Sequence, residues 1–151
     1  MYYIKKKKKE PSEAKKGQKR SKPDLVRKLD DVFSKYIRLR DAMPNGYCKC
    51  ISCGRIKPFS EFDAGHFYSR KHMGTRFDED NVWAECSGCN RFSADHLVNF
   101  QTNLIRKIGM GRFELLGVKA HEVKKWCDFE LEAMIKHYSA EVKRLKEEKG
   151  L

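Results

Sequence analysis

Two Cys-x-x-Cys pairs limit the folds that are open to this chain. Cys50 and Cys53 form the first pair, and Cys86 and Cys89 form the second pair, 32 residues further on. Four thiolates in two tight turns suit a tetrahedral Zn²⁺, and Gly54 lets the backbone turn around the metal. Because four cysteines fill the coordination shell, we expect a structural zinc that pins two chain segments together. The redox-dithiol alternative lacks a thioredoxin-like βαβ context.

Composition favours a small core and a nucleic-acid partner. The 151 residues are 36% charged and 40% hydrophobic, and the formal net charge is +12. A basic balance of this size is typical of proteins that bind nucleic acids. No apolar run approaches the roughly 20 residues of a membrane span, and no secretory signal follows the start. We therefore expect a soluble, cytoplasmic protein with no membrane partner.

Residues 1–22 carry eight of the twelve net positive charges and almost no apolar side chain after Ile4. A segment of this kind buries too little surface to offset the entropy of ordering, so we predict a disordered basic arm. Two interpretations stay open for it. It is either a solvated tail that aids solubility or a non-specific contact with phosphates, driven by counterion release.

We predict one domain over residues 23–151, of class α+β. An amphipathic helix should begin near Ser21 and Pro23 and end before Pro44. A zinc-anchored core is expected at about 45–109. It should contain short strands at 56–59, 62–68 and 81–85, a polar loop at 69–80, and a helix that begins at Ser93 or at Asn90 and is closed by Gly109. One more helical turn is expected at 112–116.

A charged last helix is expected at about 121–149. Its apolar stripe includes Cys127, which we expect to be packed, and it either packs on the domain or meets a second chain. Cys48 is out of phase with the first cysteine pair and is expected to be a spare. The fold class is then a zinc-anchored core flanked by N- and C-terminal helices.

Three polar residues lie inside the frame set by the cysteines. His66 follows a predicted strand, Asn81 stands five residues before Cys86, and Asn90 directly follows Cys89. Each residue alone is typical of a turn or a cap. Together with the two cysteine pairs, they form the layout of HNH (ββα-metal) nucleases. We therefore favour an HNH-type site over three unrelated polar residues.

Residues from about 25 to 146 also resemble the lambdoid-phage Rap/NinG recombination protein family. The resemblance rests on segments 33–42, 50–54, 64–67, 75–81, 86–91 and 104–109. It implies a phage- or prophage-encoded endonuclease that cuts Holliday junctions and other branched DNA. The Cys-x-x-Cys-Asn ending also resembles phage endonuclease VII, in which an Asp directly before the active His binds metal. Gly65 holds that position here, and Asp63 is the nearest carboxylate.

The resemblance assigns His66 the role of general base, with Asn81 holding its loop. A catalytic Mg²⁺ would be bound by the Asn90 oxygen and perhaps by Asp63, since hard cations prefer oxygen ligands. We expect His72 in a loop and His96 on a helix surface, pointing away from Asn90. Four cations are expected to contact DNA phosphates: Arg76, Arg91, Arg70 and Lys71. The alternative for each of them is a solvated surface charge.

A homodimer is the expected assembly, because a four-way junction has two-fold symmetry and needs two matched cuts. The terminal helices could form its interface. The main rival to the nuclease is a non-catalytic zinc module that binds DNA or RNA. A weaker rival is an adaptor whose last helix recruits a partner protein.

Overall fold

The computed structural model describes residues 21–93 and 95–151. Nearly all of the predicted basic arm therefore lies outside the described residues. Within them, the chain is a mixed α+β protein with five α-helices and two small antiparallel sheets. The elements are α1 (Lys22–Asp41), β1 (Tyr47–Lys49), β2 (Ile56–Pro58), the 3-10 turn η1 (Phe59–Glu61), β3 (Phe62–His66), β4 (Val82–Cys86), α2 (Ser87–Phe92), α3 (His96–Ile108), α4 (Met110–His121) and α5 (Asp128–Lys149).

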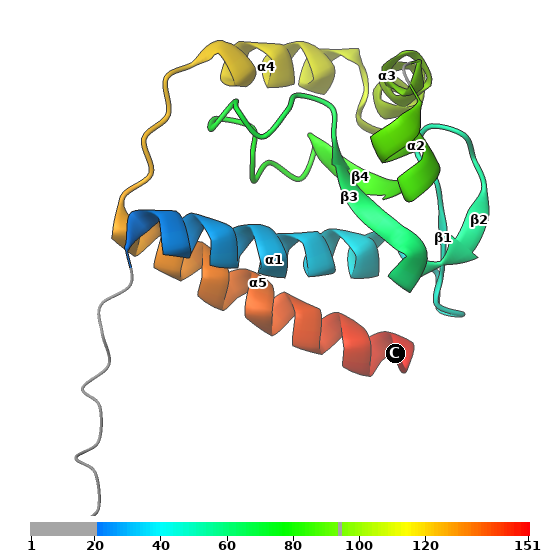
Figure 1. Ribbon diagram of the computed structural model, residues 1–151, viewed down its shortest axis with the longest axis horizontal. Coiled ribbons are helices and arrows are strands. Elements are labelled where there is room, and N and C mark those ends of the chain that lie inside the picture. The colour runs from blue at the N-terminus through cyan, green and yellow to red at the C-terminus, as the bar shows by residue number, and fades with distance from the viewer. Residues whose placement is uncertain (1–20, 94) are drawn as a thin grey trace, which may run out of the picture.

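The first and last helices form one layer of the molecule (Figure 1). Helix α1 begins with Pro23 in its first turn, as predicted, and its apolar stripe is buried. Helix α5 lies along it and buries Leu131, Ile135 and Tyr138 in the same core. Of the two alternatives for the last helix, packing on the domain is therefore the observed one. Its stripe is already covered within this chain.

The ribbon of β3 and β4 lies over α1 and carries the candidate site. The two strands pair antiparallel, with His66 opposite Val82 and Phe62 opposite Cys86. Ala64 and Val82 join the core that α1 and α5 form. The short hairpin of β1 and β2 lies beside this ribbon (Figure 1), and the turn between its two strands carries the first cysteine pair.

Three predicted helix boundaries are wrong. The helix expected from Ser93 or Asn90 begins at His96, and a separate helix, α2, precedes it, so Asn90 lies inside that earlier helix. The single turn expected at 112–116 is the twelve-residue helix α4. The last helix begins at Asp128 rather than 121, because Glu130 accepts a hydrogen bond from the Cys127 backbone N–H (2.8 Å) and caps the helix there.

The two cysteines outside the Cys-x-x-Cys pairs differ in burial. Cys127 stands at the N-cap of α5 and is exposed, so its predicted packing role is wrong. Cys48 is buried, and its Sγ lies 3.3 Å from the Arg38 carbonyl oxygen. None of the helices in the described part of the chain combines the length and apolar character needed to cross a membrane.

Candidate functional site

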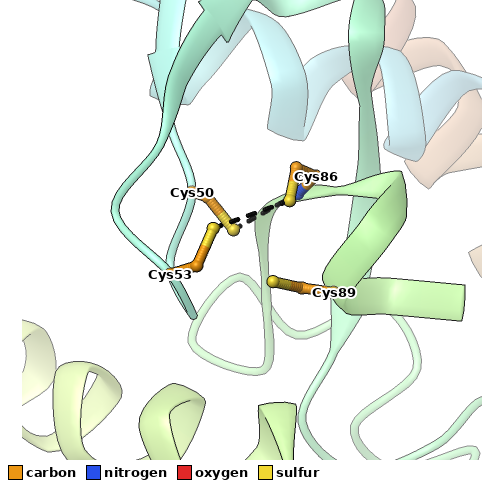
Figure 2. Close-up of side chains that lie close together, drawn as sticks. All are labelled: Cys50, Cys53, Cys86 and Cys89. Carbon is orange, nitrogen blue, oxygen red and sulfur yellow. Dashed lines mark hydrogen bonds between the residues drawn. The ribbon is translucent and has the colours of Figure 1, made fainter. Parts of the chain in front are cut away.

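The four predicted cysteines meet in one cluster, where the loop after β1 approaches the start of α2. Figure 2 shows their sulfur atoms pointing toward one another. All four Sγ atoms lie within 4.8 Å of one another, and the Sγ atoms of Cys53 and Cys86 are 3.7 Å apart. A tetrahedron with Zn–S bonds of about 2.3 Å has edges of about 3.8 Å. The donor set and its spacing therefore fit a metal such as Zn²⁺.

Backbone geometry around the cluster supports a metal knuckle. Gly54 adopts φ +73°, and its N–H donates to the Cys50 carbonyl oxygen (3.0 Å). The Cys86 N–H donates to the Cys50 Sγ (3.3 Å). Burial raises the pKa of Cys50 and of Cys89. Burial also acts upward on Cys53, but hydrogen bonds, first from the Arg55 backbone, outweigh it and lower that pKa. Thiolates, the form that binds metal, are thus favoured at Cys53.

A cavity of about 520 Å³ lies beside the β3–β4 ribbon. Its lining includes Asp63 and His66 from β3, Asn90 from α2, and His96 from α3. The fold therefore brings two of the three predicted catalytic residues to one cavity. The third, Asn81, lies behind it in the interior.

His66 has a defined ring orientation. Its Nε2 lies 3.0 Å from the Arg76 carbonyl oxygen, and its Nδ1 lies 3.2 Å from that of Ala64. A neutral imidazole donates from only one nitrogen. With the proton on Nε2, which makes the shorter contact, the lone pair lies on Nδ1. Burial lowers the pKa of His66, so the neutral ring is favoured.

Asn81 is fully buried and makes three hydrogen bonds to the loop after β3. Its amide oxygen accepts from the Tyr68 N–H (2.8 Å), and its Nδ2 donates to the carbonyl oxygens of Tyr68 (2.9 Å) and Thr75 (3.0 Å). The same loop carries the Arg76 carbonyl that accepts from His66. Asn81 thus ties together the loop whose Arg76 carbonyl contacts the His66 ring.

The Asp63 carboxylate is paired. Arg91 Nη2 lies 2.9 Å from Asp63 Oδ1, and Asn90 Nδ2 donates to Asp63 Oδ2 (3.1 Å). Burial acts to raise the pKa of Asp63, but the hydrogen bonds from Arg91 and Asn90 outweigh it and lower the pKa. Because Asn90 uses its amide nitrogen, its amide oxygen is left for another partner. Carboxylate and amide oxygens together suit a hard divalent cation.

The four cations predicted to contact DNA fall into two groups. Arg76 is paired with Asp30 of α1 (Nε to Oδ1, 3.0 Å), with only 20% of its side chain exposed. Arg91 is more exposed but pairs with Asp63. Arg70 and Lys71 are exposed and form no ion pair within the described part of the chain. The latter two are therefore the better placed of the four for a phosphate.

The prediction that His96 points away from Asn90 assumed one continuous helix and is wrong. The break between α2 and α3 turns His96 to the cavity that Asn90 also lines. Its Nδ1 lies 2.8 Å from Oε1 of Glu85, a residue that our sequence analysis passed over. A single charge in the otherwise apolar segment 82–86 was the available signal. Of the other histidines, His72 lies in the loop, as expected.

Fold and site together define a small α+β protein with a four-cysteine cluster suited to a metal ion and an adjoining polar cavity. A family model described as "NinG: Bacteriophage Lambda NinG protein" matches residues 3–148. The chain belongs to this NinG family, as the resemblance predicted.

Curated relatives carry the same name. The chain is 28% identical over 127 residues to Protein ninG of Salmonella phage P22, covering 83% of this chain and 59% of that protein. It is 28% identical over 123 residues to Protein ninG of Escherichia phage lambda, covering 80% of this chain and 57% of that protein. The chain thus spans just under three fifths of the length of these relatives. No solved structure matches it.

Proposed function

We propose that this chain is a metal-dependent DNA endonuclease with an HNH-type site, which cuts Holliday junctions and other branched DNA in the bacterial host cytoplasm. The observation that carries the proposal is the shared cavity, to which β3 brings His66 and α2 brings Asn90. The four-cysteine cluster lies at the junction of β4 and α2, so a zinc there would hold the two sides of the cavity in register. Membership of a lambdoid-phage family supports a substrate in DNA recombination.

His66 serves as the general base in this proposal. Its Nδ1 lone pair accepts a proton from the attacking water, while the hydrogen bond from Nε2 to the Arg76 carbonyl holds the ring. Burial keeps the ring neutral to lower pH than an exposed histidine, so the base is available across the physiological range.

Asn90 and Asp63 would hold the catalytic Mg²⁺ or another divalent ion. When bound, such a cation stabilises the charge that develops on the phosphate and on the leaving oxygen. Arg91 neutralises Asp63 in its absence, so cation binding competes with the Arg91–Asp63 pair. An Arg91 released from Asp63 becomes available to a DNA phosphate.

A homodimer remains part of the proposal, because one junction needs two cuts. The apolar stripe of α5 is covered by α1, so the dimer would use another surface. Light scattering with and without a four-way junction measures this directly, and a monomeric mass in both conditions would contradict it.

The central test is cleavage of a labelled four-way junction beside a linear duplex, with Mg²⁺ or EDTA. We expect metal-dependent cleavage of the junction that His66→Ala abolishes while DNA binding and zinc content are retained. His137→Ala is the matched control, because His137 is exposed on α5, away from the cavity lining. Equal cleavage by the wild type and His66→Ala would refute the catalytic assignment.

A non-catalytic zinc module that binds nucleic acid is the second candidate, and one feature favours it. Lys107 Nζ lies 4.7 Å from the Trp83 ring. Lys49 lines the same cavity, of about 300 Å³. Cations beside an aromatic ring suit a nucleic-acid backbone. Binding without cleavage under Mg²⁺, Mn²⁺ and Ca²⁺ would support this module over the enzyme.

A further inference from the structure

Glu85 is a buried carboxylate that the proposed mechanism does not use. It is 0% exposed and lies on β4, next to the zinc-site residue Cys86. Its Oε1 accepts a hydrogen bond from the Ser52 hydroxyl and lies 2.8 Å from His96 Nδ1. Its Oε2 has no hydrogen-bond partner within the described residues. A buried polar atom without a partner is costly, so its retention calls for an explanation.

Gly65 is the reason that Glu85 fits. In the β3–β4 ribbon Asp63 lies opposite Glu85 and Gly65 lies opposite Trp83. A Cβ added at residue 65 would lie 2.8 Å from the Glu85 Cβ and closer still to its Oε2. Real side chains do not approach so closely. A side chain at residue 65 and the Glu85 carboxylate therefore exclude each other.

His96 links this carboxylate to the cavity. The ring turns Nδ1 toward Glu85 and lines the same cavity as Asn90. When Nδ1–H donates to Glu85, the lone pair lies on Nε2, which makes no hydrogen bond within the described residues. A histidine that donates one ring N–H to a carboxylate and presents the other nitrogen is the usual arrangement of a metal ligand.

We infer that His96, oriented by Glu85, is a ligand of the divalent cation in this cavity, together with the Asn90 oxygen. The role of that cation in cleavage rests on the proposed function. Glu85 is a positioning residue, since it acts through the imidazole. An imidazole ligand favours transition-metal ions over Mg²⁺, which prefers oxygen ligands. The site therefore binds Mn²⁺ more tightly than Mg²⁺.

Mn²⁺ binding to the full, zinc-loaded chain tests the inference without any cleavage assay. We expect His96→Ala to weaken Mn²⁺ binding at least tenfold in calorimetric titration, and to weaken Mg²⁺ binding less. Glu85→Ala should weaken Mn²⁺ binding by about 10–100-fold, the usual effect of removing the partner of a ligating histidine. His137→Ala should leave both affinities unchanged. His96→Asn, which keeps a smaller polar side chain, is the second variant if His96→Ala unfolds.

Pulsed electron paramagnetic resonance adds a direct signature. Bound Mn²⁺ should show coupling to an imidazole nitrogen in the wild type and in His137→Ala, and none in His96→Ala. Zinc content and the thermal midpoint check that each variant is folded. Wild-type Mn²⁺ affinity in both folded His96 variants, or no Mn²⁺ binding by the wild type at millimolar concentration, would overturn the inference.

The two proposals fail separately. If cleavage depends on His66 while folded His96 variants keep wild-type Mn²⁺ affinity, the ligand assignment is wrong and the nuclease stands. If Mn²⁺ binding depends on His96 but no DNA is cut with any divalent ion, the ligand assignment stands and the nuclease is wrong.

Discussion

Asn81→Ala is the substitution whose cost follows most directly from the structure. The amide is fully buried and serves three backbone groups: the N–H and carbonyl of Tyr68 and the carbonyl of Thr75. A buried polar group left without its partner costs roughly 1–3 kcal/mol. A water entering the vacated space would satisfy part of this set. We therefore expect each of the three backbone groups to cost an amount near the lower end of that range. Together they should lower the free energy of unfolding by about 3–5 kcal/mol.

That loss is a large share of the roughly 5–15 kcal/mol that stabilises a typical domain. Asn81→Asp separates hydrogen bonding from volume, because it keeps the size and the acceptor but removes both donors. We expect Asn81→Asp to be at least as destabilising as Asn81→Ala, since a carboxylate would face two carbonyl oxygens. Urea denaturation of zinc-loaded protein measures both variants, with zinc content as the control.

Hydrogen exchange gives the local readout of the same prediction. Amides in the loop at 67–80 should exchange faster in both variants, because Asn81 ties Tyr68 to Thr75 across it. Amides of α5 should change only in proportion to global stability. A loss below about 1 kcal/mol in Asn81→Ala, or a near-neutral Asn81→Asp, would refute the reasoning.

Three further outcomes are expected. Cys86→Ser should abolish stoichiometric zinc binding, measured by mass spectrometry, and lower the thermal midpoint, because metal binding and folding are coupled. Gly65→Ala should cost about 1–3 kcal/mol in urea denaturation, and less in a Glu85→Gly background that removes the clashing side chain. Gly88→Ala, inside α2 with open space around it, should be neutral or stabilising by up to about 1 kcal/mol. The free energy of unfolding should fall as the pH drops from about 6.5 through the lowered folded-state pKa of His66, because the unfolded chain binds that proton more tightly. His66→Asn should lack this part of the pH dependence. An unchanged slope of the free energy of unfolding against pH in His66→Asn would contradict the prediction.

Patterns of short range predicted much of this protein. The apolar stripe and Pro23 predicted α1, and the spacing of two cysteine pairs predicted the sulfur cluster. Short strands on both sides of a polar loop were also predicted, so His66 was expected at a strand end. Such features depend on residues a few positions apart, or on a metal that demands a particular donor set.

The orientation of side chains depended on contacts between distant segments. No local pattern indicates that Arg76 pairs with Asp30, or that the Lys149 Nζ donates to the Leu39 carbonyl oxygen (2.6 Å) at the end of α1. The direction of His96 followed from a break between two helices that periodicity had merged into one. The period of apolar residues and the spacing of motifs place a residue on a helix, strand or loop. The group that its side chain contacts is decided by the packing of the whole chain, because packing brings together groups that are far apart in sequence.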